Sequence, residues 1–230
     1  MLTWQDPRKN HLLRSLSESD YVRLEPALEL VTLQGGQVLC EPCTKSRHGY
    51  FPVSAVVSLV GLSDAGVCTP IAEIHEDGLA GVLRLLGGSK IPYHCITLIS
   101  GGAYRVQLDL LQAEFDSRGG FQQIVLGYLQ LLMIQMAQSA ICIRRHTTEQ
   151  KICKMLLLGI DRVAGNELEM TQQFIGNMLG LRREEVAYAA GKLQDDRVLE
   201  YTRGRITILD RAGLEARVCG CYLLLRSAAC

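Results

Sequence analysis

The chain has 230 residues, of which 48% are hydrophobic and 21% are charged, and its formal net charge is zero. This composition supports one or two packed domains, and it excludes a chain that is disordered throughout. The charge is uneven along the chain, because residues 1–143 carry a net charge of −3 and residues 144–230 carry +3. A mildly basic carboxyl-terminal part permits nucleic-acid binding without proving it.

The amino-terminal residues, MLTWQDPRKN, lack the basic and then apolar segments of a signal peptide. We therefore expect a cytoplasmic protein. Reducing conditions there keep most of its nine cysteines as thiols, and the odd number agrees with this.

Apolar residues recur at helical intervals in residues 10–31, which predicts helix there. From about residue 33 to 108 the texture changes to short β-branched runs separated by glycines. That pattern is typical of an antiparallel β-roll of the jelly-roll or double-stranded β-helix type, and residues 64–66, Asp-Ala-Gly, predict one hairpin turn in it.

Residues 119–143 contain no charged side chain and are long enough to span a bilayer. Five glutamines interrupt the segment, however, and an amide is costly in hydrocarbon. Alternating steps of three and four residues instead predict an interface between two helices. We expect a dimerisation helix over about residues 109–143, with a seam formed by Leu126, Leu129, Met133, Met136, Ala140 and Ile143.

The carboxyl-terminal part begins with TTEQ at residues 147–150, which fits a capping box at the start of a helix. Residues 171–194 predict a pair of helices, with Thr171 as the cap and Gly180 at the turn. The sequence LEYTRGRITILD then predicts a hairpin around Arg203 and Gly204. The expected fold is therefore α+β: a β-roll with its long helix in residues 1–143, and a winged helix–turn–helix in residues 144–230.

The second helix of that pair has an inward face with Val186, Ala190 and Leu193. Its outward face carries Arg183, Glu184 and Tyr188, and we expect these three residues to contact DNA bases. Arginine donates two hydrogen bonds to guanine, and glutamate accepts one from cytosine. Residues placed to contact phosphates are Thr171, Arg182, Lys192, Arg203 and Arg205. An ordinary helical hairpin with a solvated arginine face is the alternative.

Nearly the whole chain, from NHLLRSL to CGCYLLL, resembles the Crp/Fnr family of bacterial transcription regulators. The most specific stretch is MTQQFIGNMLGLRREEVAYAAGKLQDDRVLEYTRGRITILD. The resemblance implies a cyclic-nucleotide-binding-like β-roll, a homodimer that binds two-fold-related promoter half-sites, and contact with RNA polymerase. Arg183 and Glu184 match the family's base-reading pair, whereas Tyr188 stands where the family has a further arginine. That departure predicts an altered half-site, and Glu185 adds a negative charge near the phosphates.

Cyclic-nucleotide sensors of this family hold the phosphate with a Gly-Glu turn and an Arg-Ser pair. Here Gly78 and Gly81 are followed by no such glutamate, and residues around Tyr93 and His94 replace the Arg-Ser pair. We therefore expect no control by cyclic AMP, and the effector stays unknown. Three further cations, Arg84, Lys90 and Arg105, could bind a different anion. The alternative is that they are solvated surface residues.

Two short cysteine spacings, Cys40-x2-Cys43 and Cys219-x-Cys221, are weak metal signals. Free cysteines usually pack as small apolar residues, so we expect no metal and no cofactor. Haem ligation by His48, His75 or His94 is expected still less. A reactive thiol stays open, because the pKa of a thiol depends on its surroundings.

The chain lacks the common hydrolase, phosphate-loop and zinc-protease motifs, so we expect no enzyme. The alternative function is a ligand- or redox-sensing module whose winged domain contacts protein rather than DNA.

Overall fold

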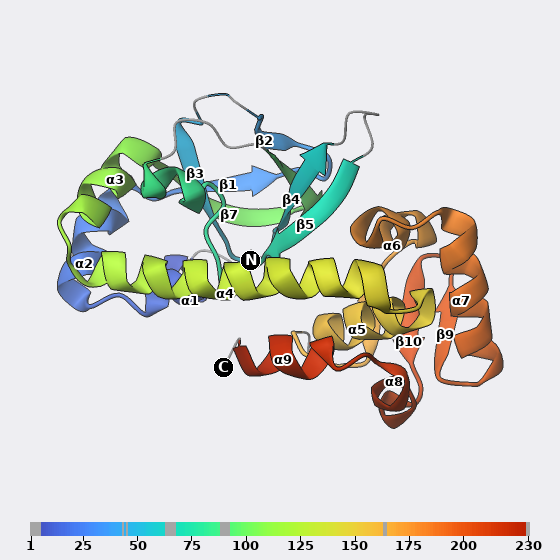
Figure 1. Ribbon diagram of the computed structural model, residues 1–230. Helices are drawn as coiled ribbons and strands as arrows, with labels where there is room; N and C mark the ends of the chain where they lie inside the picture. The colour runs from blue at the N-terminus through green and yellow to red at the C-terminus, as the bar shows by residue number, and fades with distance from the viewer. Residues whose placement is uncertain are drawn as a thin grey trace. The chain divides into compact units, whose positions relative to one another are not determined.

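The computed structural model describes residues 6–42, 44, 46–62, 68–87, 93–162 and 165–228. The chain divides into two compact units, Met1–Met133 and Ile134–Cys230, and helix α4 (Gly120–Arg145) contributes residues to both (Figure 1). The domain boundary expected near residue 143 stays a prediction.

The first unit contains two antiparallel sheets, with strand orders β1-β7-β3 and β2-β6-β4-β5. Phe51, Leu59 and Val106 are buried in the core of this unit. In β7, Val106 lies between the less buried Arg105 and Gln107, whereas β4 is buried from Val56 to Val60. This architecture confirms the β-roll, and the expected turn at residues 64–66 lies outside the described residues. The strands are β1 (Glu29–Leu33), β2 (Val38–Cys40), β3 (His48–Pro52), β4 (Val56–Leu62), β5 (Cys68–Ile74), β6 (His94–Ile99) and β7 (Gly101–Gln107).

The helix expected over residues 10–31 is shorter in the structure. Pro26 lacks an amide donor and lies at its end, and residues 29–31 belong to β1, which pairs with β7. Buried Asn10 ties this segment to the roll, because its amide donates to the carbonyls of Pro52 and Gly78, both at 2.9 Å. The helical elements here are η1 (Pro7–Lys9), α1 (His11–Arg14), α2 (Glu18–Leu24), η2 (Glu25–Ala27) and η3 (Val82–Leu86).

The segment expected as one helix over about 109–143 forms two helices, α3 (Leu108–Asp116) and α4. They are separated at Arg118, whose φ of 58° is incompatible with a continuing right-handed helix. By length and composition alone, α4 also qualifies as a membrane span, a test that the core helix of a soluble protein passes too. Its Val125, Tyr128 and Leu132 are buried within the chain.

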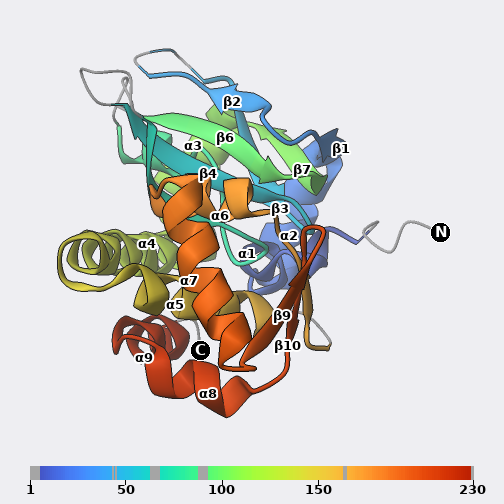
Figure 2. The ribbon, with the colours of Figure 1, turned by 90° about the vertical axis from the view of Figure 1, so that its right-hand side faces the viewer.

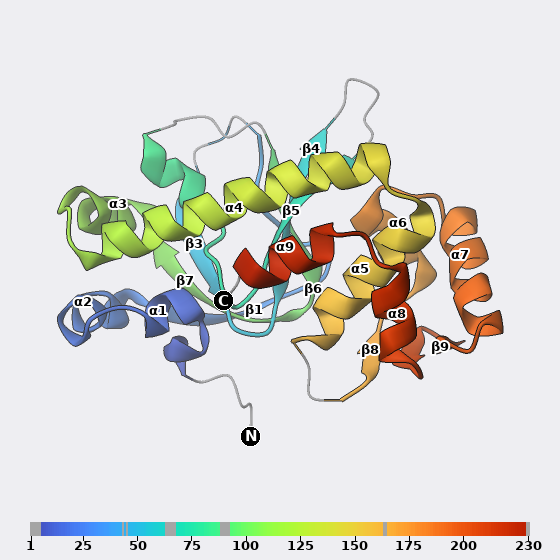
Figure 3. The ribbon, with the colours of Figure 1, turned by 60° about the horizontal axis from the view of Figure 1, so that its bottom comes forward.

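The second unit combines helices with a small antiparallel sheet of order β8-β10-β9. The expected capping box is confirmed: Thr147 Oγ1 accepts from the Gln150 amide, and the Gln150 side chain accepts from the Thr147 amide. In Figure 3, helix α9 lies beside α5 in this unit. The elements are α5 (Thr148–Ile160), β8 (Glu167–Glu169), α6 (Gln172–Leu179), α7 (Arg183–Asp195), β9 (Leu199–Thr202), β10 (Arg205–Ile208), α8 (Arg211–Arg217) and α9 (Cys221–Ala228).

Candidate nucleic-acid interface

Helices α6 and α7 form the expected pair, joined by a tight turn. Thr171 caps α6 through a 3.1 Å hydrogen bond from the Phe174 amide, and Gly180 ends it with a φ of 63°. The Leu181 amide donates to the Gly176 carbonyl at 2.9 Å. A Cβ on Gly176 would lie only 2.8 Å from the Leu181 carbonyl oxygen, so the close approach of the turn to α6 requires glycine there.

Helix α7 separates its buried and exposed residues as the helical spacing predicts. Val186 and Leu193 are buried completely, and Ala190 nearly so. Arg183 and Glu184 are exposed in the first turn, and Tyr188 follows one turn later with 80% of its surface exposed. All three outer side chains are exposed to solvent.

The hairpin of β9 and β10 lies beside α7 and makes the wing (Figure 2). Its turn residues, Arg203 and Gly204, both have positive φ, as a two-residue type I′ turn requires. The Gly204 carbonyl accepts from the Met170 amide at 2.8 Å, and the Tyr201 hydroxyl donates to the Met170 carbonyl at 3.1 Å. The wing tip is thereby fixed next to the start of α6, and Arg203 is exposed there.

The cations of this surface differ in their partners. No ion pair to another described residue is found for Arg183 or Arg203. Lys192, by contrast, donates to Glu149 at 2.7 Å, and Arg205 lies 3.6 Å from Glu167. A DNA phosphate would therefore have to compete with Glu149 for Lys192 and with Glu167 for Arg205. The competition is weaker at Arg205, because its carboxylate partner is more distant.

Glu185 has a role that the sequence analysis missed. Its carboxylate accepts a 2.9 Å hydrogen bond from the Arg182 amide, which caps α7 and lowers the pKa of Glu185. The guanidinium of Arg182 also lies 3.4 Å from this carboxylate. The charge of Glu185 is thus engaged at the helix start and partly balanced by Arg182.

Residues 150–217 match the family model described as a Crp-like helix–turn–helix domain. The global nitrogen regulator of Synechococcus elongatus is 21% identical over 196 residues, covering 81% of this chain and 88% of the relative. FixK2 from Bradyrhizobium japonicum superposes with a TM-score of 0.68 at 16% identity, covering 84% of this chain and 98% of that one. A Crp/Fnr transcriptional regulator from Thermus thermophilus gives a TM-score of 0.63 at 16% identity, with coverages of 82% and 97%.

Residues 150–217 form a Crp-like helix–turn–helix domain. Regulators with a Crp-like helix–turn–helix domain bind DNA, and the family is in general not one of enzymes. The winged unit described above contains this domain, and the whole chain has the same fold as the solved Crp/Fnr-family structures.

In the β-roll, two of the three candidate anion-binding cations are paired with carboxylates. Arg105 contacts Glu29 at 2.6 Å, and Arg84 lies 3.6 Å from Asp109. Lys90 lies outside the described residues. Each pairing favours a surface cation over an anion site.

The structure does not test the Cys40-x2-Cys43 spacing of the β-roll as a ligand pair, because it describes only the first of these two cysteines. Cys40 lies opposite Cys95 on the neighbouring strand, and a hydrogen bond from the Cys95 thiol lowers the pKa of Cys40 to about 7. Cys43 lies outside the described residues. Of the three histidines considered for haem, His75 contacts Glu73 at 3.1 Å, while His48 and His94 lie in different strands, β3 and β6.

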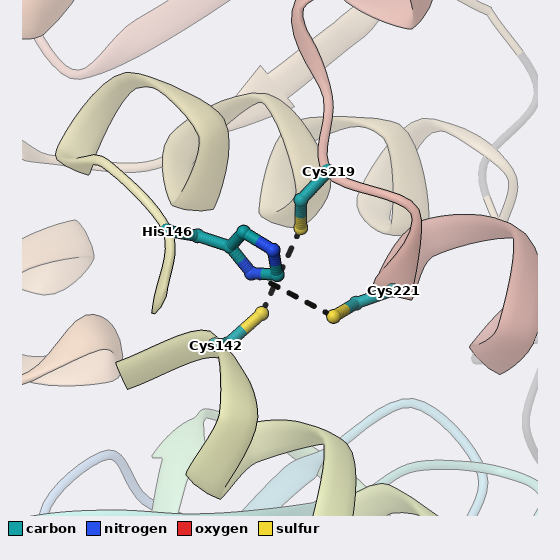
Figure 4. A group of neighbouring side chains, drawn as sticks. All are labelled: Cys142, His146, Cys219 and Cys221. Carbon is teal, nitrogen blue, oxygen red and sulfur yellow. Dashed lines mark hydrogen bonds between the residues drawn. The ribbon is translucent and has the colours of Figure 1, made fainter. Parts of the chain in front are cut away.

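The structure brings four residues together that the sequence analysis did not combine. Cys219 and Cys221 meet Cys142 and His146 in one cluster of the second unit (Figure 4). Cys142 and His146 are four residues apart at the end of α4, a spacing that places two side chains on one helix face. That spacing was the available signal, but 73 residues separate His146 from Cys219 along the chain.

Proposed function

We propose that the protein is a cytoplasmic homodimer that binds two-fold-related DNA half-sites through α7 and the wing. The observation that carries this proposal is the exposed first turn of α7, where Arg183 has no carboxylate partner among the described residues while the opposite face is buried. A recognition helix inserts such a turn into the major groove.

The chemistry of the outer face suits base recognition. Arg183 can donate two parallel hydrogen bonds to a guanine, and Glu184 can accept one from a cytosine. Tyr188 offers a hydroxyl and an apolar ring in place of a cation, so the half-site differs from one read by three charged residues. These roles for Arg183, Glu184 and Tyr188 come from their exposure on α7 together with the family resemblance.

Phosphate contacts would come from the flanks of this surface. Arg203 at the wing tip is exposed, and Thr171 lies at the start of α6. Arg182 before α7 is also exposed, with the Glu185 carboxylate 3.4 Å from its guanidinium. Lys192 and Arg205 join them when DNA displaces their carboxylate partners. Such contacts fix the register of the protein on the duplex and supply affinity without sequence preference.

The dimer would form along α4, whose apolar residues are left exposed by the single chain. Leu126, Met133 and Ile143 are 48%, 70% and 50% exposed, and Ala140 is exposed as well. Met136 is half-buried, and Leu129, at 6%, already packs within its own chain. A two-fold pairing of this face would remove that apolar surface from water.

Regulation by cyclic AMP is not part of this proposal. The Gly-Glu turn and Arg-Ser pair are lacking in the sequence, and Arg84 and Arg105 face carboxylates. Without a bidentate arginine, a cyclic phosphate loses its strongest partner. Recruitment or obstruction of RNA polymerase follows the pattern of the family.

The test begins with a selection of bound fragments from random DNA by the purified protein, followed by titration of the selected site. Arg183→Ala should weaken binding by about 1–3 kcal/mol, or roughly 5–150-fold, and relax the preference at one position of each half-site. Arg14→Ala, which removes an exposed arginine of the first unit, is the control and should bind as the wild type does. Equal affinity of Arg183→Ala and wild type would remove α7 from the interface.

A further inference from the structure

Three cysteines and one histidine of the second unit point their ligand atoms at one another. All four atoms lie within 4.8 Å of each other. Cys142 Sγ is 3.7 Å from Cys219 Sγ, and Cys221 Sγ is 3.7 Å from His146 Nδ1 (Figure 4). The three thiols are buried and His146 is half-buried.

The ligand atoms come from two places that the fold holds side by side. Cys142 lies in the last turn of α4, and His146 follows the end of this helix. Cys219 and Cys221 flank Gly220 just before and at the start of α9. Each place thus contributes two ligands from a short segment, which is the usual construction of a structural zinc site.

Two of the distances match the separation between ligands of a tetrahedrally coordinated zinc ion. With Zn–S bonds of about 2.3 Å, two sulfur ligands of one zinc ion lie about 3.8 Å apart, and a sulfur and a nitrogen slightly less. The two 3.7 Å separations agree with these edges. A cluster of several iron atoms would spread its ligands further, so the compact set fits a single ion.

We propose that Cys142, His146, Cys219 and Cys221 bind one Zn²⁺ ion, with all four positions filled by protein. Each of the three thiols gives up its proton on binding, and His146 binds as the neutral imidazole, so three protons are released per ion. Three thiolates and Zn²⁺ leave a net charge of −1. Lys154 lies 3.4 Å from Cys142 Sγ and would balance this charge.

The ion would join the end of α4 to the start of α9 within the second unit. No backbone hydrogen bond between these two segments is found among the described residues, so the metal would supply the direct connection. Because an unfolded chain has no preformed site, zinc should stabilise the folded unit.

The first experiment uses the full chain, reduced and freed of metal with a chelator. One equivalent of Co²⁺ should give the visible bands of a tetrahedral ion and a thiolate-to-metal charge-transfer band, and one equivalent of Zn²⁺ should abolish both. Zinc at about 100 times its Kd should raise the thermal midpoint by about 5–10 °C. Wild-type protein that is folded and reduced but takes up neither ion would overturn the proposal, as would the absorption of an iron–sulfur cluster.

The second experiment tests the ligands one by one. Zinc binding should weaken by more than about 100-fold in each of four variants: Cys142→Ser, His146→Gln, Cys219→Ser and Cys221→Ser. The loss should exceed the roughly 10–100-fold that is typical when a residue hydrogen-bonded to a metal ligand is mutated. Cys153→Ala is the matched control, because it removes a buried thiol of the same unit outside the cluster, and it should bind zinc as the wild type does. Variants that keep wild-type zinc affinity would overturn the assignment. If a variant fails to fold, the cobalt spectrum of the wild type still decides.

Discussion

Asp161 is an ionisable residue that connects three helices of the second unit. It caps the end of α5, and its two oxygens accept from Arg211 at 2.6 Å and from the buried Tyr222 hydroxyl at 2.9 Å. Burial acts to raise the pKa of Asp161, but the hydrogen bonds from Arg211 and Tyr222 and the nearby positive charges outweigh it, so the pKa is lowered. The carboxylate therefore links α5 to α8 and α9 more strongly when it is charged.

We expect Asp161→Asn to lower the free energy of unfolding at neutral pH by about 1.5–3 kcal/mol, the usual contribution of hydrogen bonds to a charged group. Because the folded pKa lies below the unfolded value of about 3.9, this stabilisation is present above that pH and is lost as pH falls through the folded pKa. Denaturant titrations at several pH values should show the gap between wild type and variant closing in acid. Glu215→Gln, which removes the exposed partner of Arg211, should cost less than about 1 kcal/mol. A gap that persists unchanged in acid would contradict this account.

Among the elements, α4 is the one through which we expect the homodimer to form. Its exposed apolar residues lie along the helix from Leu126 to Ile143, and Met133 is the most exposed of them at 70%. In a two-fold interface each residue meets the same surface of its partner, so one substitution acts twice.

Met133→Asp should therefore dissociate the dimer. Two carboxylates forced into one apolar seam cost about 3 kcal/mol or more, which raises the dimer dissociation constant by at least about 100-fold. Sedimentation velocity over a range of concentrations measures the shift, and circular dichroism checks that the helices remain. Val22→Asp alters another exposed apolar residue, on α2, and should leave the dimer intact. A Met133→Asp protein that sediments as wild type would exclude α4 as the seam.

The success of sequence reasoning differed from element to element for a physical reason. The caps at Thr147 and Thr171 and the hairpin at Arg203 depend on residues a few positions apart, so local sequence predicted them correctly. Strand β1 was missed because its pairing with β7 is 76 residues distant, between Glu29 and Arg105. The break at Arg118 was missed because a positive φ at arginine has no signature in the sequence.

The same contrast applies to the candidate sites. The outward face of α7 follows from helical spacing within 13 residues, and its burial pattern was predictable. The ion pair between Lys192 and Glu149 joins two helices, and the cysteine cluster joins segments 77 residues apart. Such contacts depend on tertiary packing, which spacing alone does not reveal.

At the scale of the molecule, zero net charge conceals a basic carboxyl-terminal part. If each protomer places three cations on phosphates, a dimer neutralises about six, and affinity should fall about 1,000-fold between 50 and 200 mM salt. Fluorescence anisotropy with the selected site at four salt concentrations measures this slope. Arg203→Ala should make the slope shallower by about two, one contact per protomer. Binding insensitive to salt would instead favour a winged domain that contacts protein.

The close approach at Gly176 has a consequence for the geometry of recognition. Any side chain at that position would push the Leu181 carbonyl, and with it the pivot on which α7 begins. Because α7 runs for 13 residues, or about 20 Å, a small rotation at its first turn becomes a displacement of ångströms at its far end. Two-fold symmetry would apply that rotation to both recognition helices. The absence of a Cβ at Gly176 thus helps to determine the angle at which the two recognition helices would enter successive major grooves of the DNA.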